Sequence, residues 1–227
     1  MAAMTAPALD RMPARPQVRR VAELRLRSRT GPLQAHVAWP APAEQAPALL
    51  VFFPDPGRDA GSLCRALCRL AGVVVLSATP RSAPAEPAST AFDDAAAVLG
   101  WAADHAEELD ADPGRLMVGG ERAGAALAAA VTLHARDQWW PAIARQLLIH
   151  PELDAWRASV PYASSLRTAP VAGAAPATVV WGSARGEGGR PFAARLREAG
   201  VEVEELQHDD VPSAALLASV ARSLRCA

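Results

Sequence analysis

The stretch of this 227-residue sequence with the clearest chemical signature is VGGERAGAALAAAV, residues 118–131. An apolar run ends in two glycines, a Glu-Arg-Ala-Gly segment follows, and a long alanine-rich run comes next. This order predicts a strand, a sharp turn and a helix, and turns of this kind usually present a nucleophile. The central residue here is Arg122, whose guanidinium stays protonated and has no usable lone pair. Arg122 therefore cannot attack a carbonyl, and the turn must have another use.

Arg122 is expected at the start of a helix, where free backbone N–H groups and the guanidinium together favour an anion. One hypothesis is a pocket for a small carboxylate or phosphate, with Asp55, Gly57, Arg58, Glu121 and Arg122 as the ligand-binding residues. The alternative is that Arg122 pairs internally with Glu121 or Asp55 and plugs the site. The internal pairing is the preferred interpretation.

The composition excludes several classes of function. The formal net charge is −1 and the acidic and basic residues are interspersed, so no nucleic-acid partner is expected. All 23 basic residues are arginine, which excludes a Walker lysine, a Schiff-base lysine and a Ser-Lys dyad. Cys64 and Cys68 share a helical face and are predicted to be core residues, and with Cys226 the odd count favours a reducing compartment. We expect no metal and no cofactor.

The chain shows no signal for a membrane or for export. Residues 1–17 lack an apolar leader segment, and no run of about 18 apolar residues follows. We therefore expect a cytoplasmic protein without membrane contact. It would consist of a disordered tail over 1–17 and a single domain over 18–227.

The periodicity of the apolar residues predicts an α/β fold. Alternating patterns indicate an antiparallel pair of strands at 21–28 and 33–39 and a late strand at 201–206. Continuously apolar runs indicate buried strands at 48–53, 73–78, 115–120, 146–150 and 177–182. Helices are predicted at 63–72, at about 90–109, and at 122–136, 191–200 and 213–224. The helix at 90–109 begins with Thr90 and two aspartates suited to its positive end. This order predicts a mostly parallel sheet of about eight strands, with an antiparallel start and helices on both faces.

Four ordered segments carry a family resemblance. LVFFPDPGRDAGS stands where the family has a strand ending in His-Gly-Gly-Gly, and VVVLSATPRSAPAEPASTAFDDAAAVLGW is similar to its Tyr-Arg-Leu-Ala-Pro-Glu turn and Ala-x-x-Asp-Asp helix. LDADPGRLMVGGERAG is similar to its Asp-Pro-x-Arg lead into the nucleophile elbow, and QLLIHPELD to its Leu-x-Tyr-Pro-x-Leu-Asp strand end. Together they resemble the α/β-hydrolase superfamily, and within it the hormone-sensitive-lipase-like esterases of the α/β-hydrolase fold-3 family. The resemblance covers 48–154 strongly and 176–224 moderately.

The resemblance also shows where a catalytic triad would lie, and this sequence departs from the family at each position. The elbow motif Gly-x-Ser-x-Gly reads GERAG, with Arg122 in place of the serine. The position of the acid aligns with Ser183 and that of the histidine with Ser213. In the oxyanion motif, Pro56 removes a backbone donor and Asp55 brings a negative charge. The resemblance therefore implies the family's fold without its hydrolytic mechanism, and we expect no catalytic residues at these positions.

A relocated triad is an alternative. His208, followed by Asp209 and Asp210, lies shortly before the expected histidine position and could act as a base oriented by a carboxylate. Ser62 and Ser77 are the nearest serines at strand or loop ends, but neither sits on an elbow. A solvated loop is the preferred interpretation of His208 and the two aspartates.

The sequence also bears on what surrounds the site. Only about twenty residues, 154–176, stand where these esterases have an insertion that completes a helical cap, so a shallow and wet pocket is expected. Trp139 and Trp140, and Trp156 near Tyr162, are expected either to anchor a partner or ligand or to cover the top of the sheet where the cap would lie. The apolar stripe of 213–224 fits either a dimer interface or packing on the sheet.

The leading hypothesis is a catalytically inactive esterase homologue that acts by binding. Its target would be a small carboxylate or phosphate, a second copy of itself in a homodimer, or an active relative. One alternative is a lyase or cyclase, in which Arg122 polarises a carbonyl and Asp55, Glu121 or His208 handles a proton. The other is a carboxylesterase with a relocated triad.

Overall fold

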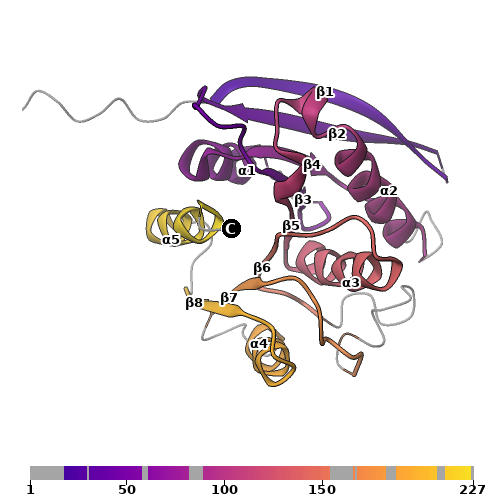
Figure 1. Cartoon of the computed structure of the whole chain (residues 1–227), viewed down its shortest axis with the longest axis vertical. Helices are drawn as coiled ribbons and strands as arrows, with labels where there is room; N and C mark the ends of the chain where they lie inside the picture. The colour runs from indigo at the N-terminus through magenta and orange to yellow at the C-terminus, as the bar shows by residue number, and fades with distance from the viewer. Residues whose placement is uncertain are drawn as a thin grey trace, which may run out of the picture.

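The computed structural model describes residues 18–29, 31–57, 61–81, 89–153, 166, 168–182, 188–208 and 213–225. Eight strands in this part of the chain form one sheet in the order β1-β2-β4-β3-β5-β6-β7-β8 (Figure 1). They are β1 (Val18–Ser28), β2 (Gly31–Pro40), β3 (Leu49–Phe53), β4 (Val74–Ala78), β5 (Leu116–Glu121), β6 (Arg145–Ile149), β7 (Ala177–Trp181) and β8 (Val203–Gln207). The predicted sheet is confirmed, whereas the tail predicted over 1–17 lies outside the described residues.

The direction of the strands follows from the pattern of their apolar residues. β1 and β2 alternate between apolar and polar positions and form an antiparallel pair, and β2 is also antiparallel to β4. Every later pair of neighbours is parallel. β3, β5 and β6 are buried at every residue because helices cover both faces of the sheet there. The predicted antiparallel start is confirmed.

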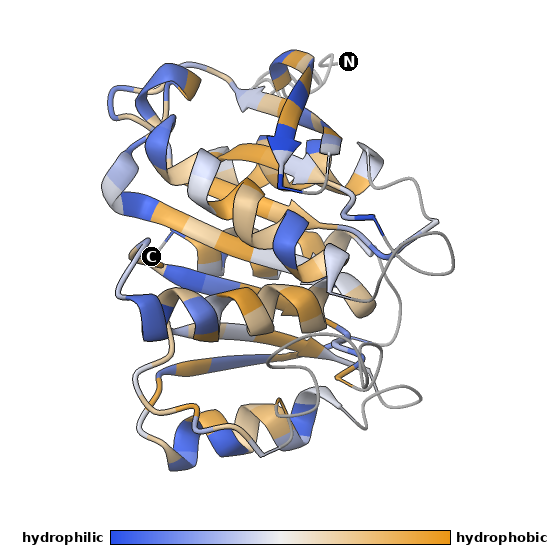
Figure 2. Ribbon diagram, turned by 90° about the vertical axis from the view of Figure 1, so that its right-hand side faces the viewer, coloured by the Kyte–Doolittle hydropathy of each residue, from blue (hydrophilic) through white to orange (hydrophobic). Residues whose placement is uncertain are grey.

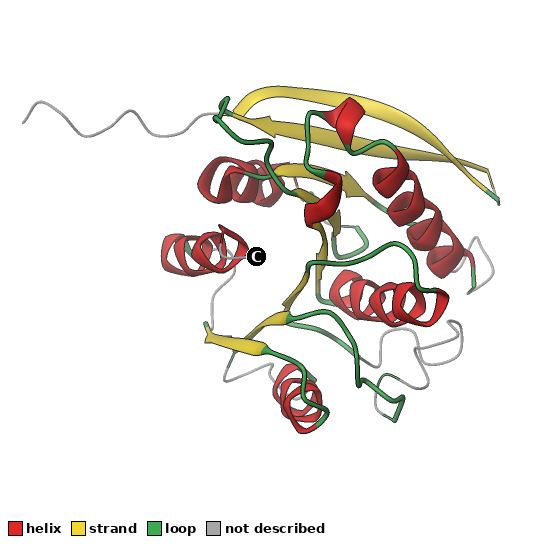
Figure 3. Ribbon diagram, in the orientation of Figure 1, coloured by secondary structure: helices red, strands yellow, loops and turns green. Residues whose placement is uncertain are grey.

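Five α-helices of the described chain cover the two faces of the sheet (Figures 1 and 3). α1 (Gly61–Leu67), which continues as a π-helical turn over Cys68–Gly72, packs on one face with α5 (Ala214–Arg225). α2 (Thr90–Asp104), α3 (Ala123–Gln138) and α4 (Gly189–Glu198) pack on the other. Figure 2 shows the hydrophobic residues concentrated in the central strands between these layers. The apolar stripe of α5 is buried in the first of these layers, so packing within the domain accounts for it.

Cys64 of α1 and Cys68 of its π-helical continuation are buried and form no disulfide, as predicted for small core residues. Burial, with a further contribution from Cys64, raises the pKa of the Cys68 thiol to about 12. Cys68 therefore stays protonated and unreactive at neutral pH. None of the helices in the described residues has the length and apolar character needed to cross a bilayer.

The helix predicted at about 90–109 ends earlier than expected, at Asp104. His105 leaves helical geometry, and a single 3₁₀ turn covers Glu107–Leu109. The indole N–H of Trp39 donates to the carbonyl oxygen of Leu109 at 2.7 Å and holds this turn against β2. A tertiary contact therefore overrides a helical pattern that the local sequence would continue.

The two aspartates near the start of α2 have different roles. Asp93 lies in the first turn, where a negative charge favours the helix as predicted. Asp94 is fully buried, and its carboxylate accepts hydrogen bonds from the backbone N–H of Arg81 at 3.1 Å, from Nε at 3.0 Å and from Nη2 at 2.8 Å. The prediction that both aspartates serve the helix end is therefore wrong for Asp94, which fixes the segment after β4 instead.

The tryptophan pair lies far from the turn at Arg122. Trp139 and Trp140 follow the C-terminal end of α3, whereas Arg122 precedes its N-terminal end. A helix of this length spans about 24 Å. Trp139 is 93% exposed, and the ring of Trp140 packs against Gly100 of α2. The hypothesis that the aromatic residues cover the top of the sheet is wrong for Trp139 and Trp140, whereas Trp156 and Tyr162 lie outside the described residues.

Replacing Asp94 by alanine tests the role of its buried carboxylate. We expect Asp94→Ala to lower the free energy of unfolding by about 2–4 kcal/mol, because the guanidinium of Arg81 loses its hydrogen-bonded partner in a largely buried place. Urea denaturation followed by circular dichroism measures the change. Asp93→Ala is the matched control and should cost less than about 1 kcal/mol. Equal losses in the two variants would contradict this assignment.

Candidate functional site

The turn between β5 and α3, called the elbow below, places residue 122 at the carboxyl end of the central strands. β5 ends at Glu121, and Arg122 adopts φ 55° and ψ −114° immediately before the helix. This conformation is rare outside glycine and costs on the order of 1–3 kcal/mol. The Arg122 N–H donates to the carbonyl oxygen of Ile149 at 2.8 Å, and the Arg122 carbonyl accepts from the N–H of Glu152 at 3.1 Å. The predicted strand, turn and helix are confirmed.

Two glycines make this turn sterically feasible. A Cβ atom at Gly124 would lie 2.0 Å from the carbonyl oxygen of Phe53 and 2.6 Å from that of Pro54. A Cβ atom at Gly120 would lie 2.4 Å from the backbone of Gly124. Because no side chain can approach so closely, the start of α3 packs on the end of β3 only with glycine at both positions.

The side chain of Arg122 forms two internal ion pairs. Its Nε lies 3.1 Å from Oδ2 of Asp55, and its Nη2 contacts Oε1 of Glu152. The side chain of Arg122 is 25% exposed and that of Asp55 is 19% exposed, so the first pair is shielded from bulk water. Asp55 follows β3 and Glu152 follows β6, the two strands that flank β5. One guanidinium therefore joins three adjacent strand ends.

The charges at this site do not suit a reaction that creates an anion. In the ion pairs that the described residues form here, one guanidinium faces two carboxylates, a formal excess of one negative charge within this cluster. An oxyanion hole needs backbone or side-chain donors directed at the developing charge. Here the strongest donor, the guanidinium, is already bound by carboxylate oxygens.

The structure brings together some of the residues predicted from the sequence. Asp55, one of the two predicted internal partners of Arg122, forms the ion pair. Glu121 is buried as the last residue of β5. Gly57 is exposed, with φ 81° and open space around its Cα. Arg58 lies outside the described residues.

Glu152 is the member of the site that sequence reasoning missed. It stands in the segment PEL, two residues after His150 and three residues after the end of β6 at Ile149. The available signal was topological, because the carboxyl ends of neighbouring parallel strands meet at one edge of the sheet. Acidic residues after β3 and after β6 are both within reach of a side chain at the end of β5.

Ser213 and His208, two further residues considered for a triad, each form a local hydrogen bond. Ser213 precedes α5, and its hydroxyl accepts a hydrogen bond from the N–H of Leu216 at 3.1 Å, the bond of a helix N-cap. His208 follows the edge strand β8, and its N–H donates to the carbonyl oxygen of Trp181 at 2.9 Å. Ser183 lies outside the described residues.

A sheet with this strand order and direction, with helices on both faces and a glycine-flanked elbow after β5, defines an α/β-hydrolase fold. Residues 55–181 match a family model described as alpha/beta hydrolase fold, named Abhydrolase_3. The chain therefore belongs to this family, and the resemblance seen in the sequence is confirmed.

Known relatives are esterases by name. The chain is 33% identical to Esterase LipI of Mycobacterium tuberculosis over 171 residues, which are 72% of this chain and 53% of LipI. It is 39% identical to Carboxylic ester hydrolase LipN of the same species over 138 residues, 51% of this chain and 37% of LipN. The matches thus span about half or less of the length of these curated relatives. An esterase structure from Pyrobaculum calidifontis superimposes with a TM-score of 0.83 at 22% identity, covering 93% of this chain and 86% of that one.

Substitution of the elbow glycine tests the packing that positions Arg122. We expect Gly124→Ala to cost more than about 3 kcal/mol of unfolding free energy or to prevent folding, because the new Cβ collides with rigid backbone. Guanidinium denaturation and soluble yield measure the effect. Gly57→Ala is the control, since its Cβ meets nothing within 4 Å and only the φ of 81° is strained. A folded Gly124→Ala protein as stable as Gly57→Ala would show that the close contact is not required.

Proposed function

We propose that this chain is a member of the ester-hydrolase family that acts by binding and does not cleave esters. The observation that carries the proposal is the guanidinium of Arg122, held by Asp55 and Glu152 at the elbow. In the family that position presents the nucleophile. An arginine there offers no lone pair to a carbonyl carbon.

The surroundings of Arg122 support the same conclusion. Ester hydrolysis needs a base beside the nucleophile and donors for the oxyanion. The residue that aligns with the family's histidine is Ser213, whose hydroxyl caps α5. The residue that follows Pro54 at the oxyanion motif is Asp55, whose carboxylate repels a developing negative charge. Each of these features alone would weaken hydrolysis, and together they remove its chemical basis at the elbow.

The ion pairs also bear on what is bound. An anion at Arg122 would have to displace Asp55 or Glu152, and it would enter a site that already carries excess negative charge. In a lyase or cyclase that polarises a carbonyl with Arg122, the substrate oxygen would have to compete with the same two carboxylates for the guanidinium. We therefore propose that the bound partner is a small organic anion held away from Arg122. A second copy of the chain or an active relative is the other kind of partner that this proposal admits.

Assays of ester turnover test the absence of hydrolysis. We expect the protein to hydrolyse p-nitrophenyl acetate and butyrate no faster than buffer, and Arg122→Ala to give the same rate. We also expect Arg122→Ser to stay below about a hundredth of the rate of an active relative such as LipI assayed in parallel, because a lone serine lacks its base. Circular dichroism of each variant checks that it is folded.

Ester turnover by the unmodified protein would have a defined meaning. Turnover above buffer that a serine-directed phosphonate abolishes would overturn the proposal and indicate a nucleophile elsewhere in the chain. Mass spectrometry of the phosphonate adduct would then identify the serine.

A further inference from the structure

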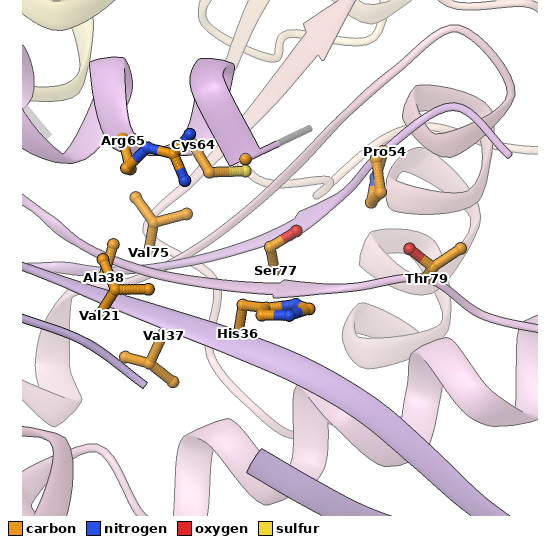
Figure 4. A pocket seen from close by; sticks show the side chains of 11 residues that line it. Val21, His36, Val37, Ala38, Pro54, Cys64, Arg65, Val75, Ser77 and Thr79 are labelled. Atoms are coloured by element: carbon orange, nitrogen blue, oxygen red, sulfur yellow. The ribbon is translucent and has the colours of Figure 1, made fainter. Parts of the chain in front are cut away.

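A second polar site lies on the face of the sheet that carries α1 (Figure 4). It is a cavity of about 310 Å³ between α1 and strands β2 and β4. Figure 4 shows Cys64 and Arg65 on α1 at one side and His36 on β2 at the other, with Ser77 of β4 between them. A cavity of this size is at the lower end of the range for small-molecule sites.

The charges at this cavity contrast with those at Arg122. Arg65 lines it from α1 and forms no ion pair with a described residue, and the described residues that line it include no carboxylate. His36 adds ring nitrogens on the opposite wall. Its Nε2 lies 3.9 Å from Oε1 of Glu23, a side chain that is 86% exposed and outside the lining. A guanidinium without a neighbouring carboxylate in a cavity wall is a binding group for an anion.

Two hydroxyl groups lie within the same cavity. His36 and Ser77 are directly opposite each other in the antiparallel pair of β2 and β4, so their side chains share one face of the sheet. Thr79 follows Ser77 by two residues and also lines the cavity. Within the described residues, neither hydroxyl is hydrogen-bonded to another protein group. Both can therefore donate to the oxygen atoms of a ligand.

The remaining wall is apolar. Val21, Ala38, Pro54 and Val75 line it. Val21 is 49% exposed, which is unusual for a large hydrophobic side chain in this domain. An aliphatic or aromatic group in the cavity would remove this surface from water. The site thus combines one cation, two hydroxyls and an apolar wall.

We propose that this cavity binds a small organic carboxylate. Its carboxylate group pairs with Arg65 and accepts a hydrogen bond from Ser77, which Figure 4 shows next to Arg65, and its short aliphatic or aromatic body lies against Val21 and Ala38. This inference rests on the proposed binding function and specifies small organic carboxylates as the class of ligand. The site is distinct from the elbow, because Arg122 is not among its lining residues.

Matched pairs of ligands test the two halves of this site. Hexanoate and benzoate are the probes, with hexanamide and benzamide as neutral counterparts and inorganic phosphate as an anion without an apolar body. We expect both carboxylates to raise the Tm and to bind in titration calorimetry, and we expect the amides and phosphate to bind about ten-fold more weakly or worse. Amides or phosphate that bind as tightly as the carboxylates would overturn the proposed ligand class.

Three variants locate the bound carboxylate. Arg65→Gln should weaken hexanoate binding by about ten-fold or more, because it removes the cation from the cavity wall. Arg69→Gln is the matched control on the same helical segment, outside the lining, and should bind hexanoate as the unmodified protein does. Arg122→Ala should also leave binding unchanged. Full binding in Arg65→Gln, loss in Arg122→Ala, or no binding of either carboxylate to the unmodified protein would overturn the proposed site.

Ester turnover measured on the same samples separates the two proposals. Turnover above buffer together with Arg65-dependent carboxylate binding overturns the non-hydrolytic function and leaves the cavity as a ligand site. Absence of both turnover and carboxylate binding overturns the cavity and leaves the non-hydrolytic function intact.

Discussion

The start of α3 packs against the end of β3 so closely that a Cβ atom at Gly124 would lie 2.0 Å from the carbonyl oxygen of Phe53. Between this contact and the end of β5, the backbone at residue 122 adopts φ 55° and ψ −114°. That side chain must then project over the ends of the strands next to β5. The loop after β3 supplies Asp55 there, and the segment after β6 supplies Glu152. The ion pairs of Arg122 thus follow from backbone packing and from the residue types at three strand ends.

The same packing allows different side chains at residue 122 in one and the same fold. The steric requirement falls on Gly120 and Gly124, not on the residue between them, so serine and arginine can occupy the same strained turn. What changes is the electrostatics. A serine needs a base and oxyanion donors, whereas an arginine needs carboxylates, and Asp55 and Glu152 provide them. Carboxylates so placed stabilise the guanidinium and disfavour an oxyanion at this position, which supports the proposal of a non-hydrolytic role.

The sequence predicted the sheet well, because apolar periodicity and chain order together determine which strands are buried and parallel. It predicted helix ends and side-chain partners less well where contacts between residues distant in the sequence determine them. The hydrogen bond from Trp39 to Leu109 holds the turn that follows α2. The carboxylate of Asp94 binds Arg81 and does not serve the start of the helix. A local sequence pattern reveals neither contact. At the site, Arg122 and Asp55 could be recognised because the elbow and oxyanion motifs mark them. Glu152 has no motif of its own and becomes evident only when β6 is placed beside β5.

Arg122, at the carboxyl ends of the strands, and Arg65, on the face that carries α1, have different neighbours. These neighbours determine whether each guanidinium is paired within the protein or can bind a ligand. Arg122 is paired with two carboxylates, one of them on the half-exposed Glu152, and these ion pairs link the ends of the neighbouring strands. Arg65 lines a cavity that has hydroxyls and an apolar wall but no carboxylate among its described lining. Pro54 connects the two, since it lines the cavity and is followed by Asp55. Because two carboxylates already surround the charged guanidinium of Arg122, Arg65 is the stronger attraction for an anion of these two arginines.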